Sequence, residues 1–479
     1  MQKWLVGAAA VLALLVHVSA AHANAFDVFG IGARGTAMGG AMSATAGNYT
    51  ALYYNVGGLT LEEPGFGVGM MAAVDDVTIR LKPRPDGYNL PDLGTTSAAI
   101  PSKFRLNDRA DTDDIEDTYG VYLGAVTDLG VDELRLAVLV FLPVNRVGLQ
   151  STHYPDEREQ YFSNQLSFEL LGDRSQRQVI MVGGAYRLFR WLSVGAGLSW
   201  LPDSAGTNSV YLDNPTDQSD FDIVLDNDQG GRIAPQAGFI LSPSDGFRLG
   251  LAYRGELYFS LAGKNEVQIR GFQDKEEQFP IDQEFEVVVN YTPHQFAFGT
   301  AYETDELLVS LDVTHALWEY YRNNQGERVD GFDNTFAFRL GAEYFWNPSF
   351  KLRGGVGYEP SPVPDQTGRT NYVDNDRLIL SLGAGHPLSF LDQAIELSWY
   401  VQVQHLLARD TDKDNDGAFP DCDSDTKRLC DEIPDDTRDP VDGQPVPEYS
   451  GLQTGNPGFP GYQSFGDIIS VGVDLQWTF

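Results

Sequence analysis

The chain has 479 residues, a formal net charge of −35 at pH 7 and 42% hydrophobic residues. This hydrophobic content is enough for a folded core and excludes an intrinsically disordered protein. The acidic excess, without a basic stripe, excludes a nucleic-acid-binding protein. After the first 25 residues, no stretch has the roughly 18 consecutive apolar residues that a membrane-spanning helix needs, so any membrane crossing has to use strands.

Residues 1–23 have the three parts of a secretory signal. Lys3 supplies a positive n-region, residues 4–16 form an apolar run, and Ala21-His-Ala23 is a small-x-small cleavage site. We therefore expect this signal peptide to be removed on export, with cleavage after Ala25 as an alternative. No cysteine follows the cleavage site, which argues against a lipoprotein.

Residues 24–64 are rich in glycine and other small residues and lack the alternation of a strand. The motif G-x-G-x-x-G begins at Gly30, but no strand precedes it and no acidic residue about twenty positions later completes a dinucleotide-binding fingerprint. Small residues permit short helices and turns to pack tightly in a confined space. We predict that residues 24–64 form a plug, or hatch, to which Gly39, Gly40 and Asn55 belong.

From Phe66 onward, apolar and polar residues alternate in recurring segments, and this period of two predicts strands. In the last ten residues, which end on Phe479, the odd-numbered positions are apolar and the even-numbered ones polar or glycine. Such a strand suits lipid on one side and water on the other. We predict fourteen strands, over residues 66–80, 118–128, 132–142, 176–187, 191–201, 231–241, 246–262, 282–302, 306–321, 334–345, 349–359, 374–386, 393–406 and 465–479.

The connections between these strands alternate between short turns and long, mostly acidic loops. Short periplasmic turns and long extracellular loops are the pattern of an outer-membrane barrel. We therefore predict an all-β fold, a 14-stranded antiparallel transmembrane β-barrel over residues 65–479, with the hatch inside its lumen. The long loops are predicted at residues 81–117, 144–175, 202–230, 263–281, 322–333, 360–373 and 407–464, the last of which is the longest.

Three stretches carry a resemblance to a known family. They are Ala51–Leu59; Thr292–Tyr302, followed by Asp312 and Trp318–Tyr321; and Arg353–Asp365 with Asp374–Arg377 and Leu380–Gly383. Together they resemble the FadL/TodX (OMPP1) family of outer-membrane transporters for long-chain fatty acids and other hydrophobic compounds. The first stretch is similar to that family's N-terminal hatch, although the family's Asn-Pro-Ala is Asn-Val-Gly here.

The resemblance implies a passive transporter of the bacterial outer membrane and not an enzyme. Its expected partners are a hydrophobic small molecule, fatty acid or hydrocarbon, together with outer-membrane lipid and lipopolysaccharide; we expect a monomer that requires no cofactor. The family also implies capture among extracellular loops, a pocket against the hatch and sideways release at a kinked third strand. The third predicted strand runs into Pro143, which removes a ladder donor, so Pro143 is the lateral-gate candidate, with a plain strand terminator as the alternative.

Several arginines fall on inward faces by alternation. A ligand carboxylate would take one of them as a bidentate partner. The alternative is that they form ion pairs with inward acids, which is ordinary in a polar barrel interior. The ligand-binding candidates are Arg34 in the hatch and Arg135, Arg248, Arg254 and Arg339.

The longest loop contains an acid-rich repeat. Asp412, Asp414 and Asp416 alternate before a glycine, and Asp423 stands at the twelfth position. This spacing is that of a calcium loop, but no flanking helices complete an EF-hand. Two interpretations stay open over residues 410–425, a Ca²⁺-stapled loop and a solvated acidic loop.

The chain's two cysteines, Cys422 and Cys430, lie in the same loop. Because an exported protein meets an oxidising compartment, we expect a Cys422–Cys430 disulfide. Both this bond and a bound Ca²⁺ would stiffen the loop without indicating a substrate.

Three functions compete at this point. The first is passive uptake of hydrophobic molecules, by loop capture, a hatch-gated pocket and lateral release. The second is a secretion-associated plugged barrel that shuttles or anchors other proteins. The third, a general porin, is disfavoured by the plug, since an open channel needs an unobstructed lumen.

Overall fold

The structure is a computed structural model of the whole chain. It describes residues 25–82, 117–144, 166–168, 179–201, 204–212, 220–230, 232–270, 281–322, 326–365, 370, 372–390, 393–413, 432–433, 453–454, 458 and 461–479. The predicted signal peptide lies outside these residues. No helix in this part of the chain is long and apolar enough to span a membrane.

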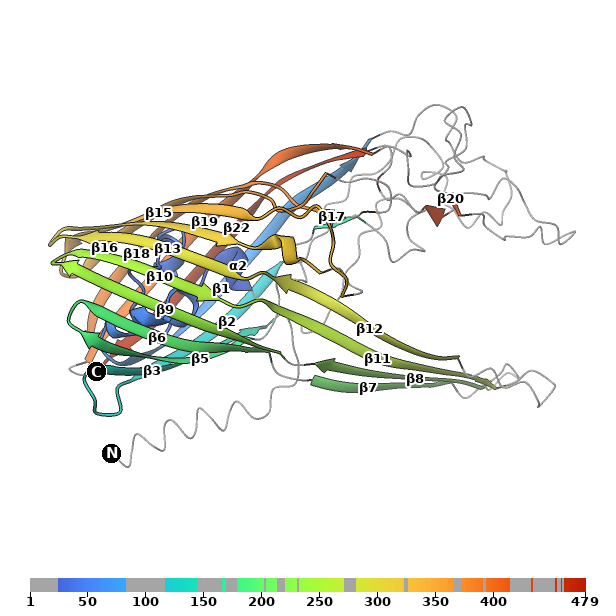
Figure 1. The fold of residues 1–479 in the computed structure, drawn as a ribbon, viewed down its shortest axis with the longest axis horizontal. Helices are drawn as coiled ribbons and strands as arrows, with labels where there is room; N and C mark the ends of the chain where they lie inside the picture. Colours follow the sequence, from blue (N-terminus) through green and yellow to red (C-terminus); the bar gives the residue numbers. More distant parts are fainter. Residues whose placement is uncertain are drawn as a thin grey trace, which may run out of the picture.

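Fourteen antiparallel strands form a closed barrel (Figure 1), which confirms the predicted fold class. The first strand pairs with the last, from Gly65 opposite Thr478 to Leu81 opposite Tyr462, so the wall has no free edge. The strands are β1 (Gly65–Leu81), β2 (Thr118–Thr127), β3 (Leu134–Pro143), β5 (Val179–Phe189), β6 (Leu192–Leu201), β9 (Arg232–Ser244), β10 (Phe247–Arg254), β13 (Gln295–Glu303), β14 (Leu307–Ala316), β15 (Thr335–Asn347), β16 (Phe350–Glu359), β18 (Arg377–Phe390), β19 (Gln393–Asp412) and β22 (Gly461–Thr478).

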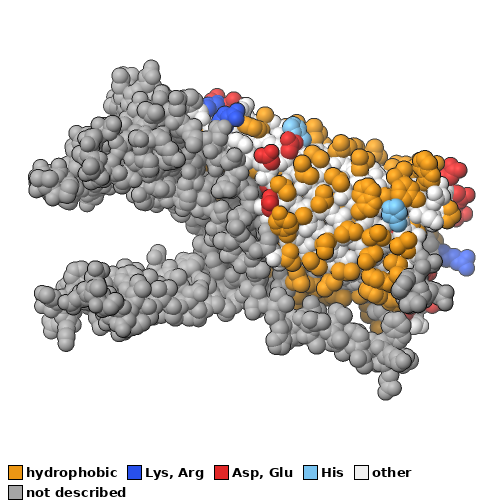
Figure 2. Space-filling view, turned by 180° about the vertical axis from the view of Figure 1, so that it is seen from behind, with side chains coloured by type: hydrophobic (Ala, Val, Ile, Leu, Met, Phe, Trp, Pro, Cys, Tyr) orange, Lys and Arg blue, Asp and Glu red, His pale blue; other side chains and the backbone are white. Residues whose placement is uncertain are grey.

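The outside of the barrel is a band of apolar side chains (Figure 2). On β1 this band runs from Phe66 to Val74, and the next outward residue, Asp76, is polar and exposed. Asp76 stands opposite Asp467 of β22, which stands opposite His405 of β19, so one polar row crosses three strands. Ten residues of a strand tilted by about 40° rise about 25 Å, the height of an outer-membrane apolar band. This row therefore marks the extracellular edge of the membrane.

A second sheet projects from the extracellular end of the barrel (Figure 1). Its order, β7-β8-β11-β12, continues that of the barrel strands β6-β9-β10-β13. Its strands are β7 (Ser204–Leu212), β8 (Asp220–Gly230), β11 (Leu257–Arg270) and β12 (Ile281–Thr292).

This sheet corrects part of the sequence prediction. Residues 202–230 and 263–281 were expected to be loops, but they contain strands. The predicted strands 246–262 and 282–302 each divide in two, between β10 and β11 and between β12 and β13. The reason is that residues 202–230 and 263–281 are rich in polar and acidic residues, such as Asp220, Asp222 and Asp226 of β8, and such stretches resemble loops when length and composition alone are considered.

Short elements complete the described fold. Near the barrel mouth, β4 (Ser167–Phe168) pairs in parallel with β17 (Tyr372–Val373), and β20 (Glu432–Ile433) pairs with β21 (Gln453–Thr454). A 3₁₀ turn, η5 (Trp318–Tyr320), follows β14. The remaining helices, α2 (Ala25–Phe29), α3 (Ala33–Ala37), α4 (Ala51–Tyr54) and the 3₁₀ helix η2 (Val56–Thr60), lie inside the barrel and are coloured blue in Figure 1.

Candidate functional site

The hatch, residues 25–62, is a chain of very short helices joined by turns. Gly39 and Gly40 follow α3 with φ angles of 64° and 81°, in the left-handed region that only glycine adopts at no steric cost. Asn55 begins η2, and its side-chain oxygen accepts a hydrogen bond from the amide of Gly57 at 3.0 Å. The Asn55 amide also donates to Ser43 and Phe239 carbonyls at 2.6 and 3.0 Å. Other residues at Gly39 and Gly40 would strain the backbone, and a substitution of Asn55 would remove hydrogen bonds that hold the turns.

Glycines of the barrel wall allow the hatch backbone to touch the wall backbone. A Cβ added at Gly195 would lie 2.6 Å from the carbonyl carbon of Val56, and one at Gly341 would lie 2.5 Å from the carbonyl oxygen of Met38. Real Cβ atoms do not approach this closely, so these positions accept only glycine while the hatch is in place. Backbone atoms of the hatch lie this close to Gly195, Gly238, Gly250, Gly341 and Gly355, whereas Gly67 and Gly124 face the Tyr49 side chain and Gly383 faces the Cβ of Ala37. We call these eight wall glycines the glycine belt.

Buried ion pairs join the hatch to the wall below this belt. Arg34 of α3 lies 2.9 Å from Glu62 and 3.0 Å from Glu343 of β15, and Glu343 also accepts from Arg353 of β16 at 2.6 Å. Burial alone would lower the pKa of Arg34, but the Glu343 and Glu62 carboxylates outweigh it, so its pKa is raised. Arg34 therefore remains charged, with its partners supplied by the protein.

Two wall carboxylates accept hydrogen bonds from hatch amides. Asp474 of β22 accepts from the Ala33 amide at 2.7 Å, and Asp312 of β14 accepts from the Ser43 amide at 2.7 Å. Asp474 satisfies the first backbone donor of α3, which has no partner within the helix, and Asp312 satisfies the amide of Ser43 in the turn that follows the helix. These contacts lie on different sides of the barrel and prevent the hatch from tilting.

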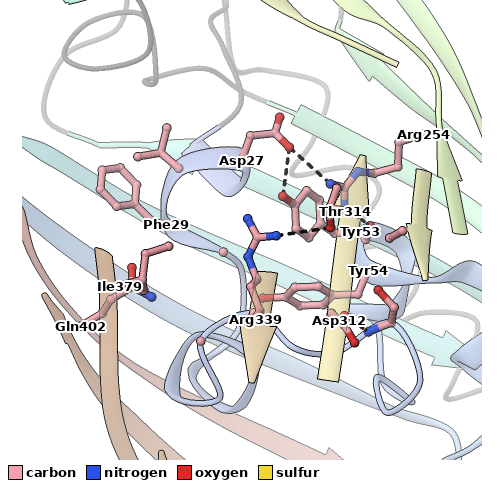
Figure 3. Close-up of a pocket in the computed structure, with 16 residues that line it drawn as sticks. Asp27, Phe29, Tyr53, Tyr54, Arg254, Asp312, Thr314, Arg339, Ile379 and Gln402 are labelled. Atoms are coloured by element: carbon pink, nitrogen blue, oxygen red, sulfur yellow. Dashed lines mark hydrogen bonds and ion pairs between the residues drawn. The ribbon is translucent and has the colours of Figure 1, made fainter. Parts of the chain in front are cut away.

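A small cavity lies over the hatch (Figure 3). Asp27 lines one side of it: its carboxylate accepts from the Tyr53 hydroxyl at 3.0 Å and lies 3.7 Å from Arg254 of β10. On another side Arg339 of β15 donates to Thr314 at 3.3 Å and to Glu359 at 2.8 Å. Phe29 and Ile379 supply an apolar side (Figure 3).

The size and polarity of this cavity limit what it holds. Its volume of about 40 Å³ has room for about three water molecules, at roughly 10–15 Å³ each. Two acids, Asp27 and Asp312, balance two cations, Arg254 and Arg339, among its lining residues. The cavity therefore suits water or a small polar group in this conformation, and a long apolar chain would have to lie elsewhere in the lumen.

Above the hatch, one side of the lumen is apolar. Its inward side chains come from β22, β1, β3, β5 and β6, which adjoin one another in the wall except that β2 lies between β1 and β3, and all are buried in one cluster with Phe29 of the hatch. We call this surface the apolar wall; it comprises Val77, Ile79, Leu139, Phe141, Val179, Met181, Leu201 and Ile468. The opposite side carries the charged residues of the cavity.

Sequence comparison identifies the family. The pattern of the family described as outer membrane protein transport protein (OMPP1/FadL/TodX) matches residues 159–414, which is more than half of the chain. The chain belongs to the OMPP1/FadL/TodX family. Its place in that family of outer-membrane proteins agrees with the closed barrel and its apolar outer band, and locates the protein in the outer membrane.

Curated members of the family align with this chain over short segments. Alkane uptake protein A of Marinobacter nauticus is 32% identical over 146 residues, which are 27% of this chain and 32% of that protein. The long-chain fatty acid transport protein of Escherichia coli K12 is 32% identical over 57 residues, which are 12% of this chain and 13% of that protein. The chain thus spans a third or less of the length of these curated relatives.

Solved structures of FadL/TodX proteins share the fold over almost the whole chain. A Pseudomonas aeruginosa FadL homologue superposes with a TM-score of 0.55 at 14% identity, covering 96% of this chain and 98% of that one. The P. putida toluene transporter TodX gives a TM-score of 0.52 at 14% identity, covering 95% and 99%. At 14% identity these superpositions establish the barrel architecture and do not identify a ligand.

The five candidate arginines of this FadL/TodX protein divide into two groups. Arg254 and Arg339 line the cavity, whereas Arg34 lies with the buried ion pairs below it. Arg135 of β3 contacts Glu63 at 3.3 Å, and Arg248 of β10 pairs with Glu303 beside a periplasmic turn. The structure therefore brings two of the five together, and a ligand role for each stays a prediction.

Pro143, the gate candidate, is the last residue of β3. The third strand pairs with β2 up to Pro143, which stands opposite Gly120, and this register is continuous. On the other side the described pairing with β5 runs to Phe141 opposite Val179, the first described residue of β5. A gate at Pro143 stays a prediction.

Most of the predicted calcium loop lies outside the described residues. Asp412, at the end of β19, pairs with Lys82. Asp414, Asp416, Asp423 and both cysteines are not among the described positions. No group of three His, Cys, Asp or Glu residues suited to a metal ion occurs within the described ranges, and the calcium and disulfide predictions stay untested.

Several residues of the cavity were missed from the sequence. Asp27 stands only four residues after the predicted signal, and Tyr53 and Tyr54 belong to a stretch noted only for its family resemblance. Burial raises the pKa of Tyr54 to about 12, so its hydroxyl stays protonated and exchanges hydrogen bonds with both backbone groups of Ile31. The one available signal was two tyrosines together in a segment of otherwise small residues.

Proposed function

We propose that this protein takes up hydrophobic molecules, hydrocarbons or long-chain fatty acids, across the outer membrane without an enzymatic step. The molecule is captured at the extracellular sheet, moves along the apolar wall to the hatch and leaves sideways into the membrane. The names of the alkane uptake and fatty acid transport relatives support this substrate class.

The apolar wall is the observation that carries the proposal. The lumen of a water-filled porin is polar, because ions and hydrophilic solutes have to cross it. Here Ile79, Phe141 and Val179 face inward above the hatch and are buried together. Each methylene of a solute gains roughly 0.8 kcal/mol when it leaves water for such a surface. An apolar lumen therefore favours a hydrophobic solute over an ion.

Two-sided patterning of the extracellular sheet supports capture there. In the register of β11 with β8 and β12, one set of alternate residues includes Val267, opposite Ile223 and Ile281. The other set includes Glu266, opposite Val224 and Asp282. Alternate residues lie on opposite faces of a sheet. The sequence of these strands thus alternates between a mainly apolar set and a mainly polar and charged set, and this pattern supports the proposed capture of a hydrophobic solute at the sheet.

Two features favour sideways release. The glycine belt brings the hatch backbone against the wall, so a passage straight to the periplasm would require the hatch to move. Release into lipid also avoids the loss of roughly 0.8 kcal/mol per methylene that release into water would bring.

Several expectations accompany this proposal. We propose that the protein acts as a monomer surrounded by outer-membrane lipid and lipopolysaccharide. Its longest loop, predicted at residues 407–464 and bounded in the structure by the end of β19 at Asp412 and the start of β22 at Gly461, is stiffened by a Cys422–Cys430 disulfide and takes up Ca²⁺ at Asp412, Asp414, Asp416 and Asp423. Removal of Ca²⁺ with EDTA should then change the rate at which a protease cleaves this loop. An unchanged rate would favour the alternative, a solvated acidic loop without bound Ca²⁺.

The proposal is tested by uptake and by co-purification. Cells with and without the protein are given labelled hexadecane, oleate and toluene, and organic extracts of the purified protein are analysed by mass spectrometry. We expect protein-dependent uptake of at least one of the three and a co-purifying hydrophobic molecule. If neither occurs, the secretion-associated alternative moves to the front; nanosiemens conductance of the intact barrel would instead support a porin.

A further inference from the structure

One acidic residue interrupts the apolar surface on β1. The inward residues of this strand above the hatch are Ala73, Asp75, Val77 and Ile79, all buried, and Asp75 stands opposite the buried Ile468 of β22. The side chain of Asp75 is 6% exposed. A carboxylate therefore lies on the proposed solute path, between residues of the apolar wall.

The carboxylate of Asp75 is buried away from water and has no hydrogen-bond partner among the described residues. Neither carboxylate oxygen accepts a hydrogen bond from any described residue. Another acid, Asp117, which directly precedes β2, acts on Asp75 electrostatically. Buried polar groups are normally paired, because an unsatisfied one costs free energy. The hydrogen-bond donor that would satisfy Asp75 is thus absent from the described protein.

We infer that Asp75 is a specificity-determining residue that favours long-chain molecules with a neutral hydroxyl end over those with a carboxylate end. A long-chain alcohol moving along the apolar wall donates its hydroxyl hydrogen to Asp75 and buries its chain against Val77 and Ile79. A fatty acid carboxylate has no hydrogen to donate and brings its negative charge against the Asp75 carboxylate, for which no described residue supplies a hydrogen-bond donor. An alkane has no polar end group, so Asp75 neither strengthens nor weakens its binding. This inference rests on the proposed uptake of hydrophobic molecules.

The neighbouring residue provides a matched control. Asp76 is the next residue of the same strand, carries the same charge and faces outward, where it is exposed. Asp75→Asn and Asp76→Asn therefore change strand chemistry and net charge equally, and only the first changes the lumen. Asp75→Leu removes the acceptor as well as the charge.

Uptake of three sixteen-carbon solutes tests the inference. Cells producing the wild type or one variant are given labelled hexadecanol, hexadecane or palmitate, and rates are normalised to the amount of folded barrel. Like-charge repulsion in a partly desolvated site is worth several kcal/mol, so we expect Asp75→Asn to raise palmitate uptake about tenfold relative to hexadecane. Asp75→Leu should also lower hexadecanol uptake to the level of hexadecane, and Asp76→Asn should change neither ratio.

The outcomes separate this inference from the proposed function. Protein-dependent hexadecane uptake with unchanged solute ratios in both Asp75 variants would overturn the role of Asp75 and leave uptake standing. Hexadecane uptake that does not depend on the protein would overturn the proposed function itself. Displacement of a fluorescent hydrophobic probe from the purified wild type gives a test without variants. Hexadecanol should displace it more strongly than palmitate, and the reverse order would refute the inference.

Discussion

The two halves of the lumen are built from the same strands for opposite purposes. In the periplasmic half, glycines, buried ion pairs and carboxylate–amide contacts fix the hatch against the wall. In the extracellular half, one side of the same wall carries large apolar side chains that pack on one another. Polar contacts with exact geometry resist movement, whereas apolar packing permits a hydrophobic solute to replace one apolar partner with another. The difference suggests a fixed floor beneath an exchangeable binding surface.

Glu343 offers the strongest test of the fixed half. Glu343→Gln leaves the buried cations Arg34 and Arg353 without their shared carboxylate, so we expect a loss of about 3–5 kcal/mol in the free energy of unfolding. Urea titration of the barrel in lipid vesicles measures it. The control is Glu303→Gln, whose partner Arg248 is at the periplasmic rim; Glu303 is 38% exposed, so this pair should cost about 0–1 kcal/mol. Equal losses would refute a special role for the buried network.

The glycine belt gives the next largest effect. Gly355→Ala inserts a methyl group into the Gly39 backbone, and overpacking of this kind costs about 1–3 kcal/mol. In Gly354→Ala, on the same strand, the nearest atom to the new methyl group is Leu382 Cδ2 at 3.7 Å. We expect increased single-channel conductance and lower thermal stability only for Gly355→Ala. Similar behaviour of both variants would mean that the hatch is loosely held.

A substitution at Ile79 tests the apolar wall in the extracellular half of the lumen. Ile79→Asn places an amide on the apolar wall, and a polar group that a hydrophobic solute must cover costs about 1–3 kcal/mol, which corresponds to roughly tenfold slower uptake of hexadecane. Thr78→Asn changes the adjacent residue, which faces outward and is partly exposed, and should leave uptake unchanged. An unaffected rate in Ile79→Asn cells with normal amounts of folded barrel would place the solute path elsewhere.

Tyr54 predicts the smallest effect, and one that depends on pH. Burial raises its pKa from 10.0 to about 12, so its contribution to stability is complete below pH 10 and is lost as the pH rises towards 12. Tyr54→Phe removes the hydrogen bonds with Ile31 and should cost about 1 kcal/mol at neutral pH. It should also reduce the decline in stability between pH 10 and 12, as measured by urea titration at each pH. An unchanged decline would assign it to other tyrosines.

Sequence periodicity was sufficient to predict the barrel because each strand shows its two faces within about ten residues. The same reasoning failed outside the membrane, where the two faces of a strand do not meet lipid and lumen. Strands β7 and β8 and the second half of β11 were expected to be loops, and β12 was merged with β13 into one predicted strand. Loop length, which helped to identify the barrel, gave no means of detecting a sheet outside the membrane.

The candidate site was much less predictable. Inward positions for Arg254 and Arg339 follow from alternation, but their meeting with Asp27 depends on how the hatch folds inside the barrel. The glycine belt was equally hidden, because each glycine is explained by a hatch residue far away in the sequence. Asp75 could have been noticed as an acid among apolar inward residues of β1. Its lack of a partner is visible only in three dimensions.

The place where the barrel closes has a consequence for assembly. The first and last strands meet along their full length, and the hatch contacts both: Asn48 donates to Gln476 of β22 at 2.8 Å, and Tyr49 packs over Gly67 of β1. The hatch precedes β1 in the chain, whereas β22 is made last. A hatch already folded against β1 would therefore offer contacts to β22 before the cylinder closes, and these contacts would favour the register in which the last strand meets the first.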